Sequence, residues 1–374
     1  MIYEEYGSLL PERVQDLIIE SLKNCSIGDT YRVNNVDGDN LSPSYSNPWL
    51  MRTMASSWTG HKLKDSNMTV SGDKWAEEFL ELFDRNQTLS EFNSPTYAGV
   101  SLYALTLAAK YLGTTESVLG KNAKRVIQEI WEYESLLWNP NLKNVAGPWD
   151  RTYGLDMNKY VAIMSLWIWS FVGKERVYKT TSPIWTMAHA DDFEIAPALA
   201  VLADYHKSLV STSSVSRLSS FAGEHTYRGH AYAPPADQVQ RNITSWLSDN
   251  VTIGAESFIQ NASGGYSKDN TSWSPAVVQW LRPDESVGYF RLYTGETSMQ
   301  ADVGPGSLNL SYPLGNSSTA FTFHLSSNPL GQTRDITGLG DIYGVNVEVI
   351  GGTVSPTPST AFCGLLGGDC DIIQ

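Results

Sequence analysis

The chain has 374 residues and a net charge of −14, and 41% of its residues are hydrophobic. This acidity argues against nucleic acid or an anionic membrane as a partner, because both attract basic surfaces. No stretch approaches the ~20 consecutive apolar residues of a transmembrane helix, so no membrane span is expected. With 12 Trp, 19 Tyr and only 18% charged residues, the composition favours a folded protein over a disordered acidic one.

The first 209 residues predict helices of two alternating kinds. Amphipathic patterns cover 11–24, 71–86 and 117–138, segments apolar on nearly all sides cover 48–60, 95–113 and 155–172, and a seventh helix covers 193–209. Outer helices of a helical toroid face solvent on one side, whereas inner helices are enclosed. We therefore expect an incomplete (α/α) helical toroid of three or four hairpins, with a plain bundle as the alternative. Asn47 and Ser94, each followed by Pro, are predicted helix caps.

A Ser/Thr-rich linker is predicted at 211–220, and short alternating runs punctuated by Gly, Pro and Asn follow it. These runs predict antiparallel strands at 287–293, 307–312, 320–326 and 344–350. The fold class is accordingly α+β. We expect a helical toroid domain over 1–210 and a β-sandwich-like domain over 221–374, whose Gly/Pro-rich tail begins near residue 351.

Ten N-x-S/T sequons indicate a secreted glycoprotein, although a polar surface rich in Ser, Thr and Asn is the alternative. Besides Asn40, they begin at nine asparagines that we predict to carry glycans: Asn24, Asn67, Asn86, Asn242, Asn250, Asn261, Asn270, Asn309 and Asn316. No apolar signal-peptide core follows Met1, so a signal peptide is expected to be absent from this chain. Cys363 and Cys370 are close enough in sequence to close a small disulfide loop, which would leave Cys25 odd.

The loops that enter the buried helices carry the most distinctive polar residues, and a toroid would bring these loops to one mouth. They span 37–52, 91–99, 146–160 and 185–194. The candidate catalytic residues are Arg151, Tyr153, Asp156 and His189, because a guanidinium can hold an oxyanion and the others can donate or relay protons. The candidate substrate-binding residues are Trp49, Arg52, Asn93, Tyr97, Trp149 and Trp185. The structural alternative is that Arg151 is simply the ion-pair partner of Asp150.

Neither a metal nor a cofactor is expected. Asp37, Gly38, Asp39 and Asn40 resemble part of a calcium loop, but the remaining ligands do not follow at the required spacing. His189 with Asp191 and Asp192 is a weak metal candidate, since two carboxylates before a helix more often serve its N-terminus. The sequence contains no P-loop, dinucleotide fingerprint, nucleophile elbow or HExxH motif.

Four segments give the chain a resemblance to a family of secreted proteins of filamentous fungi. They are YEEYGSLLPERVQDLIIESL, VDGDNLSPSYSNPWLMR, EFNSPTYAGVSLYAL and AGPWDRTYGLDMNKYV, and the resemblance covers roughly residues 3–209. Proteins of this kind include glycosylated hetero-Diels–Alderases that join a tropolone-derived quinone methide to humulene. The resemblance implies a cofactor-independent pericyclase of fungal secondary metabolism and terpenoid biosynthesis, acting on an apolar or aromatic small molecule.

A helical toroid with a β-domain also resembles polysaccharide lyases of the heparinase and chondroitinase type. That resemblance implies a carbohydrate-active enzyme, with Tyr153 or His189 as base and Arg52 or Arg151 facing the substrate carboxylate. A glycoside hydrolase would instead use a carboxylate pair such as Asp156 with Asp39. The net charge of −14 disfavours a polyanionic substrate. A third alternative is a secreted glycoprotein without enzymatic activity.

Overall fold

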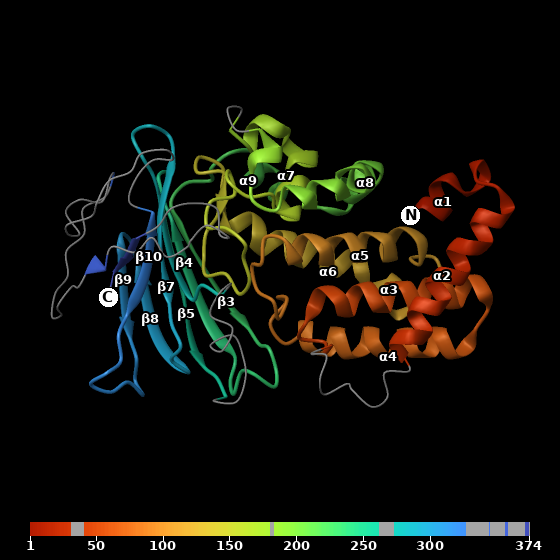
Figure 1. Cartoon of the computed structure of the whole chain (residues 1–374), viewed down its shortest axis with the longest axis horizontal. Helices are drawn as coiled ribbons and strands as arrows, with labels where there is room; N and C mark the ends of the chain where they lie inside the picture. Colours follow the sequence, from red (N-terminus) through yellow and green to blue (C-terminus); the bar gives the residue numbers. More distant parts are fainter. Residues whose placement is uncertain are drawn as a thin grey trace.

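The computed structural model describes residues 1–30, 41–179, 183–261, 273–326, 344, 356–357 and 371–373. Helices fill the N-terminal half of the chain and an antiparallel sheet fills the C-terminal half (Figure 1). The predicted α+β class is therefore confirmed. Within the described ranges, no helix is both long enough and apolar enough to cross a membrane.

Nine α-helices occur in the described residues. They are α1 (Ile2–Tyr6), α2 (Glu12–Thr30), α3 (Ser46–Leu63), α4 (Ser66–Phe83), α5 (Tyr97–Tyr111), α6 (Val118–Leu137), α7 (Ile163–Val172), α8 (Ala196–Leu209) and α9 (Thr212–Ser219). Short 3-10 helices accompany them: η1 (Gly7–Leu9), η2 (Lys174–Arg176), η3 (Ile184–Thr186) and η4 (Ala190–Ile195).

The helices form an arc of consecutive hairpins. Helices α3, α5 and α7 pack against one another in chain order, while α4 packs on α3 and α6 packs on α5. Helices α5 and α7 are largely buried, whereas α4 and α6 each keep an exposed face. This division of inner and outer helices is the one expected for an incomplete toroid.

Two helix predictions need correction. The helix expected over 155–172 begins only at Ile163, because residues 155–162 form a buried loop that pairs Tyr160 with Ala188. Its apolar residues pack as a loop, which the apolar pattern could not reveal. The expected linker at 211–220 contains helix α9. The hydroxyl of Ser211 caps this helix by accepting from the backbone N–H of Ser214, and Leu218 is buried.

The C-terminal half is dominated by one twisted antiparallel sheet. Its strands are β3 (His225–Ala231), β4 (Arg241–Leu247), β5 (Val251–Ile259), β6 (Ala276–Leu281), β7 (Val287–Tyr293), β8 (Ser298–Gly304), β9 (Ser307–Ser311), β10 (Thr322–Ser326), β11 (Pro356–Thr357) and β12 (Asp371–Ile373). The order along the sheet is β11-β12-β10-β7-β6-β5-β4-β3, and β8 leaves this path by pairing with the end of β5 and with β9. The strand predicted at 344–350 lies, apart from Gly344, outside the described residues.

The two faces of the sheet have different neighbours. On one face Trp246, Ile253 and Trp280 form a core with Met299 and Val303 of β8, so the β8–β9 hairpin covers that face in a sandwich-like manner. The opposite face turns toward the helices (Figure 1). There Ile243 and Leu247 of β4 belong to the same apolar cluster as the helical core. The helical half and the sheet therefore share a core.

Candidate functional site

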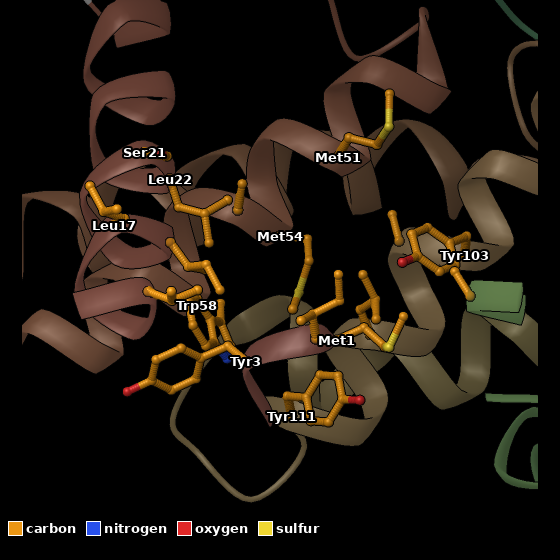
Figure 2. Close-up of a pocket in the computed structure, with 17 residues that line it drawn as sticks. Met1, Tyr3, Leu17, Ser21, Leu22, Met51, Met54, Trp58, Tyr103 and Tyr111 are labelled. Atoms are coloured by element: carbon orange, nitrogen blue, oxygen red, sulfur yellow. The ribbon is translucent and has the colours of Figure 1, made fainter. Parts of the chain in front are cut away.

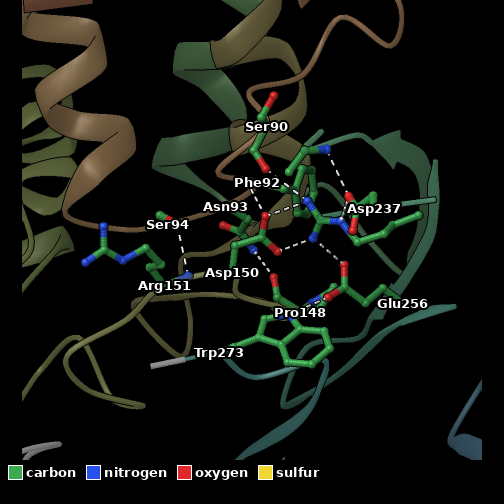
Figure 3. Close-up of polar contacts among 12 residues, drawn as sticks. Ser90, Phe92, Asn93, Ser94, Pro148, Asp150, Arg151, Asp237, Glu256 and Trp273 are labelled. Atoms are coloured by element: carbon green, nitrogen blue, oxygen red, sulfur yellow. Dashed lines mark hydrogen bonds and ion pairs between the residues drawn. The ribbon is translucent and has the colours of Figure 1, made fainter. Parts of the chain in front are cut away.

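A loop between the sheet and the helices carries the most informative sequence motif, and its side chains point in two directions. Trp149 pairs with Ser274 through backbone hydrogen bonds of 3.0 and 2.8 Å, and the carbonyl of Gly147 accepts from Ser245 at 2.6 Å. These contacts fix the loop to the sheet. Arg151, two residues after Trp149, is directed away from Asp150 and toward the helices (Figure 3).

Arg151 is held by a buried carboxylate that the sequence analysis missed. Its Nη1 lies 3.5 Å from Oε1 of Glu91, whose side chain is 2% exposed. The other Glu91 oxygen accepts from both the backbone N–H and the side-chain amide of Asn47, at 3.1 and 3.0 Å. Asn47 is thus not the predicted helix cap. The backbone N–H of Arg151 donates to the hydroxyl of Ser94 at 3.2 Å, so Ser94 also serves the loop and not the helix.

Aromatic residues complete this group. The Arg151 guanidinium lies 4.2 Å from the ring centroid of Tyr97, a cation–π contact. The hydroxyl of Tyr97 contacts that of Tyr153, and the Tyr153 ring stacks on His189 with centroids 3.9 Å apart. His189 adopts a left-handed backbone conformation (φ 53°), and its Nδ1 lies 3.8 Å from a carboxylate oxygen of Asp192.

The predicted meeting of the four entry loops at one face is confirmed by these contacts. Tyr45 precedes α3, and its ring centroid lies 5.3 Å from the Arg151 guanidinium. Tyr97 begins α5, Arg151 and Tyr153 precede α7, and His189 precedes α8. We call Tyr45, Glu91, Tyr97, Arg151, Tyr153 and His189 the mouth cluster.

Charge states at the mouth follow from burial and neighbours. Burial acts to lower the pKa of Arg151. The hydrogen bond with Tyr45 and the charge of Glu91 act in the opposite direction and together outweigh burial, so the pKa of Arg151 is raised. Burial raises the pKa of Glu91, and the hydrogen bonds from Asn47 and the charge of Arg151 oppose that rise. The pKa of Asp192 is also raised by burial, against the attraction of His189. The mouth thus offers a permanent cation beside phenol and imidazole groups.

Asp156, Asn93 and Trp149 lie elsewhere. Oδ1 of Asp156 accepts from the amide of Asn144 and from the backbone and side chain of Asn158, at 2.9–3.1 Å. The Asn93 side chain donates to the carbonyls of Ala146 and Pro148 at 2.6 and 2.9 Å. Trp149 is fully buried in a small cluster with Leu155 and Tyr289. These side chains hold the loop together. They do not line the mouth, although the sequence analysis predicted that they would.

Trp49, Arg52 and Trp185 are also separate from the mouth cluster. Trp49 is buried, and its Nε1 donates to the backbone carbonyl of Trp75 at 2.9 Å. The Arg52 guanidinium lies 3.5 Å from the Trp75 ring centroid, so these residues join α3 to α4. Trp185 on η3 is 81% exposed. Asp37, Gly38, Asp39 and Asn40 of the calcium-like loop lie outside the described residues.

A fully buried charge cluster connects the loop to the sheet (Figure 3). Arg241 of β4 binds Asp150 with both terminal nitrogens, and its Nε and Nη1 lie 2.9 Å from Asp237 and Glu256, respectively. Glu256 also accepts from Nε1 of Trp273 at 2.7 Å. The partner of Asp150 is therefore Arg241 and not Arg151. The sequence carried no signal that predicted these pairs, because Asp150, Asp237 and Glu256 lie 91, 4 and 15 positions from Arg241, respectively.

The remaining sequence predictions concern metals and cysteines. The part of the chain that the structure describes contains no group of three or more His, Cys, Asp or Glu able to hold a metal ion. Cys25 is exposed and is not bonded to any described cysteine, whereas Cys363 and Cys370 lie outside the described residues.

Comparison with family models found a match in each half of the chain. A family model described as a domain of unknown function, DUF8769, matches residues 1–204, and another so described, DUF8770, matches residues 223–374. Neither the search of curated proteins nor that of solved structures found a match. The DUF8769 match covers more than half of the chain, and the chain therefore belongs to the DUF8769 family of domains of unknown function.

Proposed function

We propose that this chain is a cofactor-independent cyclase, a pericyclase of the hetero-Diels–Alder type that joins a quinone-methide-like partner to a terpene alkene, as in fungal secondary metabolism. The observation that carries the proposal is the mouth cluster itself. A cation, two phenols in contact and an imidazole stacked on one of them come together from separate loops. Such a group can activate an oxygen without a metal or a nucleophile.

The chemistry asks two things of these residues. An o-quinone methide forms from a ring that carries a hydroxyl beside a hydroxymethyl group: the hydroxymethyl C–O bond breaks, that oxygen leaves as water, and the ring hydroxyl loses its proton and becomes the carbonyl. A donor must therefore protonate the leaving hydroxyl, a cation must hold the ring oxygen, and the proton released from the ring oxygen restores the donor. Arg151 would hold the oxygen, and Tyr153 or His189 would supply the proton, a role that their closeness in the mouth cluster supports. The cycloaddition then forms one C–C and one C–O bond and needs only that both partners be held in register.

A polysaccharide lyase is the second candidate, favoured by the stacking of Tyr153 on His189 in the cluster that includes Arg151. In that case His189 or Tyr153 would remove the C5 proton of the uronate and Arg151 would neutralise its carboxylate. The C4–O glycosidic bond would then break, the leaving oxygen would take up a proton, and an unsaturated sugar end would remain. The hydrolase alternative has lost support. Asp156 is only 4% exposed, and one of its oxygens is already hydrogen-bonded three times.

Replacing Arg151 tests the proposal directly. Arg151→Ala should lower turnover at least tenfold, since a hydrogen bond to a charged group contributes about 1.5–3 kcal/mol, and Arg151→Lys should recover only part of it. The assay offers a quinone-methide precursor with humulene and, separately, a panel of polysaccharides. Arg228→Ala, at an exposed residue of β3, is the matched control and should retain turnover. Adduct formation no faster or more selective than the uncatalysed reaction would contradict the cyclase, and new unsaturated sugar ends would favour the lyase.

We also propose that the protein is secreted and N-glycosylated. The positions of its asparagines support this. All eight sequon asparagines in the described residues are exposed or half-buried, whereas the five buried asparagines, Asn47, Asn93, Asn139, Asn144 and Asn158, all lie outside sequons. Accessible side chains are what glycan transfer requires.

Mass spectrometry of protein made in a eukaryotic secretory host tests glycosylation. Endoglycosidase treatment should lower the intact mass by several glycan units. A mass equal to that of the bare chain before treatment would refute the proposal.

A further inference from the structure

A cavity of about 650 Å³ lies at the end of the helical half that is farther from the sheet. Helices α1 and α2 form one wall, and α3 and α5 form the other (Figure 2). Its lining includes Leu22, Met54, Trp58, Tyr103 and Leu107. At roughly 30 Å³ per water-sized group, this volume accommodates about 20 non-hydrogen atoms.

The lining favours an uncharged ligand, because its side chains are uncharged and the α-ammonium of Met1 already interacts with the carboxylates of Glu4 and Glu5. No charged side chain lines the cavity. Nearby charges are already paired, because Glu4 lies 2.8 Å from Lys62 and Glu5 lies 2.7 Å from Lys110. Two polar groups of the lining are engaged by the same acids: Nε1 of Trp58 donates to Glu4 at 2.7 Å, and the hydroxyl of Tyr111 donates to Glu5 at 2.5 Å.

The cavity is accessible from solvent. Leu17 and Met51, which line it, are 49% and 43% exposed. Ile2 and Val14, also in the lining, are 55% and 38% exposed. Large apolar side chains gathered around an opening are typical of a site that covers its apolar surface by binding a ligand.

The cavity also lies on the helix faces that lead to the mouth cluster. On α5, Tyr97 of the mouth is followed at helical spacing by Val100, Ala104, Leu107 and Tyr111, and the last three line the cavity. At about 1.5 Å per residue, Tyr103 is only ~9 Å along the helix from Tyr97. Ala198 of α8 also lines the cavity, and η4 lies between α8 and His189 of the mouth cluster.

We infer that this cavity binds an uncharged, largely hydrocarbon small molecule of about 20 non-hydrogen atoms, with the end nearer Tyr97 directed at the mouth cluster. The binding stands on the cavity alone. Only the role of the ligand as the apolar reacting partner rests on the proposed function. Methionine suits such a site, because its flexible thioether adapts to irregular hydrocarbon shapes.

Dye displacement on the full chain tests the inference. Nile red, a neutral dye, should become fluorescent on binding. Hexadecanol should displace it at a concentration at least tenfold lower than hexadecanoate, because no charged side chain of the lining can pair with the carboxylate and the α-ammonium of Met1 already faces Glu4 and Glu5. Ala55→Phe and Ala104→Phe each place a ring in the cavity and should weaken dye binding at least tenfold. Ala200→Phe, at an exposed position of α8, is the matched control and should bind normally.

Several results would overturn the inference: no Nile red binding by the wild type, equal displacement by hexadecanoate, or undiminished binding by both cavity variants when circular dichroism shows them folded. If one variant fails to fold, the other decides. Normal ligand binding by a chain without cyclase activity would refute the proposed function and leave the cavity site intact. Cyclase activity that survives both cavity variants would refute the role of the cavity and leave the function intact.

Discussion

Asp150 and Arg151 are adjacent, yet they serve different parts of the molecule. Asp150 is buried against Arg241 of the sheet, whereas Arg151 faces the helices and meets Glu91. The chain bends at both residues, so their side chains leave in different directions and adjacent residues of opposite charge need not pair. Glu134 of α6 is another buried acid: it is 2% exposed, and its Oε1 has no hydrogen-bond partner.

Because its pKa is raised, Glu134 makes the unfolding free energy fall as the pH rises. Burial raises the pKa of Glu134 from 4.5 to about 8. The folded state therefore binds a proton that the unfolded state has lost, so this contribution is complete below pH 4.5 and disappears as pH rises through 8. The slope is at most roughly 1.4 kcal/mol per pH unit. Glu134→Gln should flatten the pH dependence of the unfolding free energy between pH 5 and 8, as measured by denaturant titration.

Glu12→Gln, at an exposed site of α2, is the control for that measurement and should keep the wild-type slope. A Glu134→Gln profile parallel to that of the wild type would show that Glu134 is ionised in the folded protein at neutral pH.

At the scale of elements, the 146–160 loop and strand β5 approach so closely that no side chain fits between them. A Cβ added at Gly254 would overlap the carbonyl of Gly147, which is the acceptor for Ser245. Two backbones in such contact fix the height of the loop above the sheet. The loop in turn carries Arg151 and Tyr153 to the mouth.

Gly254→Ala should accordingly lower the unfolding free energy by about 2 kcal/mol or more, because backbone must move to admit the methyl group. Gly295→Ala is the matched control, since nothing lies within 4 Å of a Cβ there, and its effect should stay within roughly 0.5 kcal/mol. Thermal and denaturant unfolding measure both. An unchanged melting temperature for Gly254→Ala would contradict the close contact.

At the scale of the whole molecule, the helical half and the sheet are joined by a common apolar core and by the Arg241 cluster. Arg241 bonds to three buried acids, Asp150, Asp237 and Glu256. Burial raises the pKa of Glu256 to about 8, so Glu256 is protonated at neutral pH and the guanidinium offsets the charges of its carboxylate partners. Its removal would leave these charges uncompensated in the interior.

Arg241→Met should lower the unfolding free energy by about 3–5 kcal/mol, the cost of breaking a buried ion pair from one side. Helical circular dichroism and tryptophan fluorescence should report one shared transition at a lower denaturant concentration. Two separate transitions in the wild type would show that the halves fold independently. Arg228→Ala, on the exposed surface of neighbouring β3, should change stability by no more than roughly 0.5 kcal/mol.

The sequence by itself determined the features that depend on local periodicity. Alternating amphipathic and buried helices predicted the arc, and period-two runs with turn residues predicted strands β7, β9 and β10. The motif around Arg151, Tyr153, Tyr97 and His189 pointed to residues that do meet. Such features were readable because each helix or strand buries one face, and that face recurs at a fixed spacing.

The tertiary structure alone decided the pairings. Glu91 for Arg151, Arg241 for Asp150 and the burial of Trp149 depend on segments that fold from far apart in the chain. The apolar cavity likewise exists only where α2, α3 and α5 meet. A buried charge must find its counter-charge wherever the fold places one, and local periodicity carries no information about that distant partner.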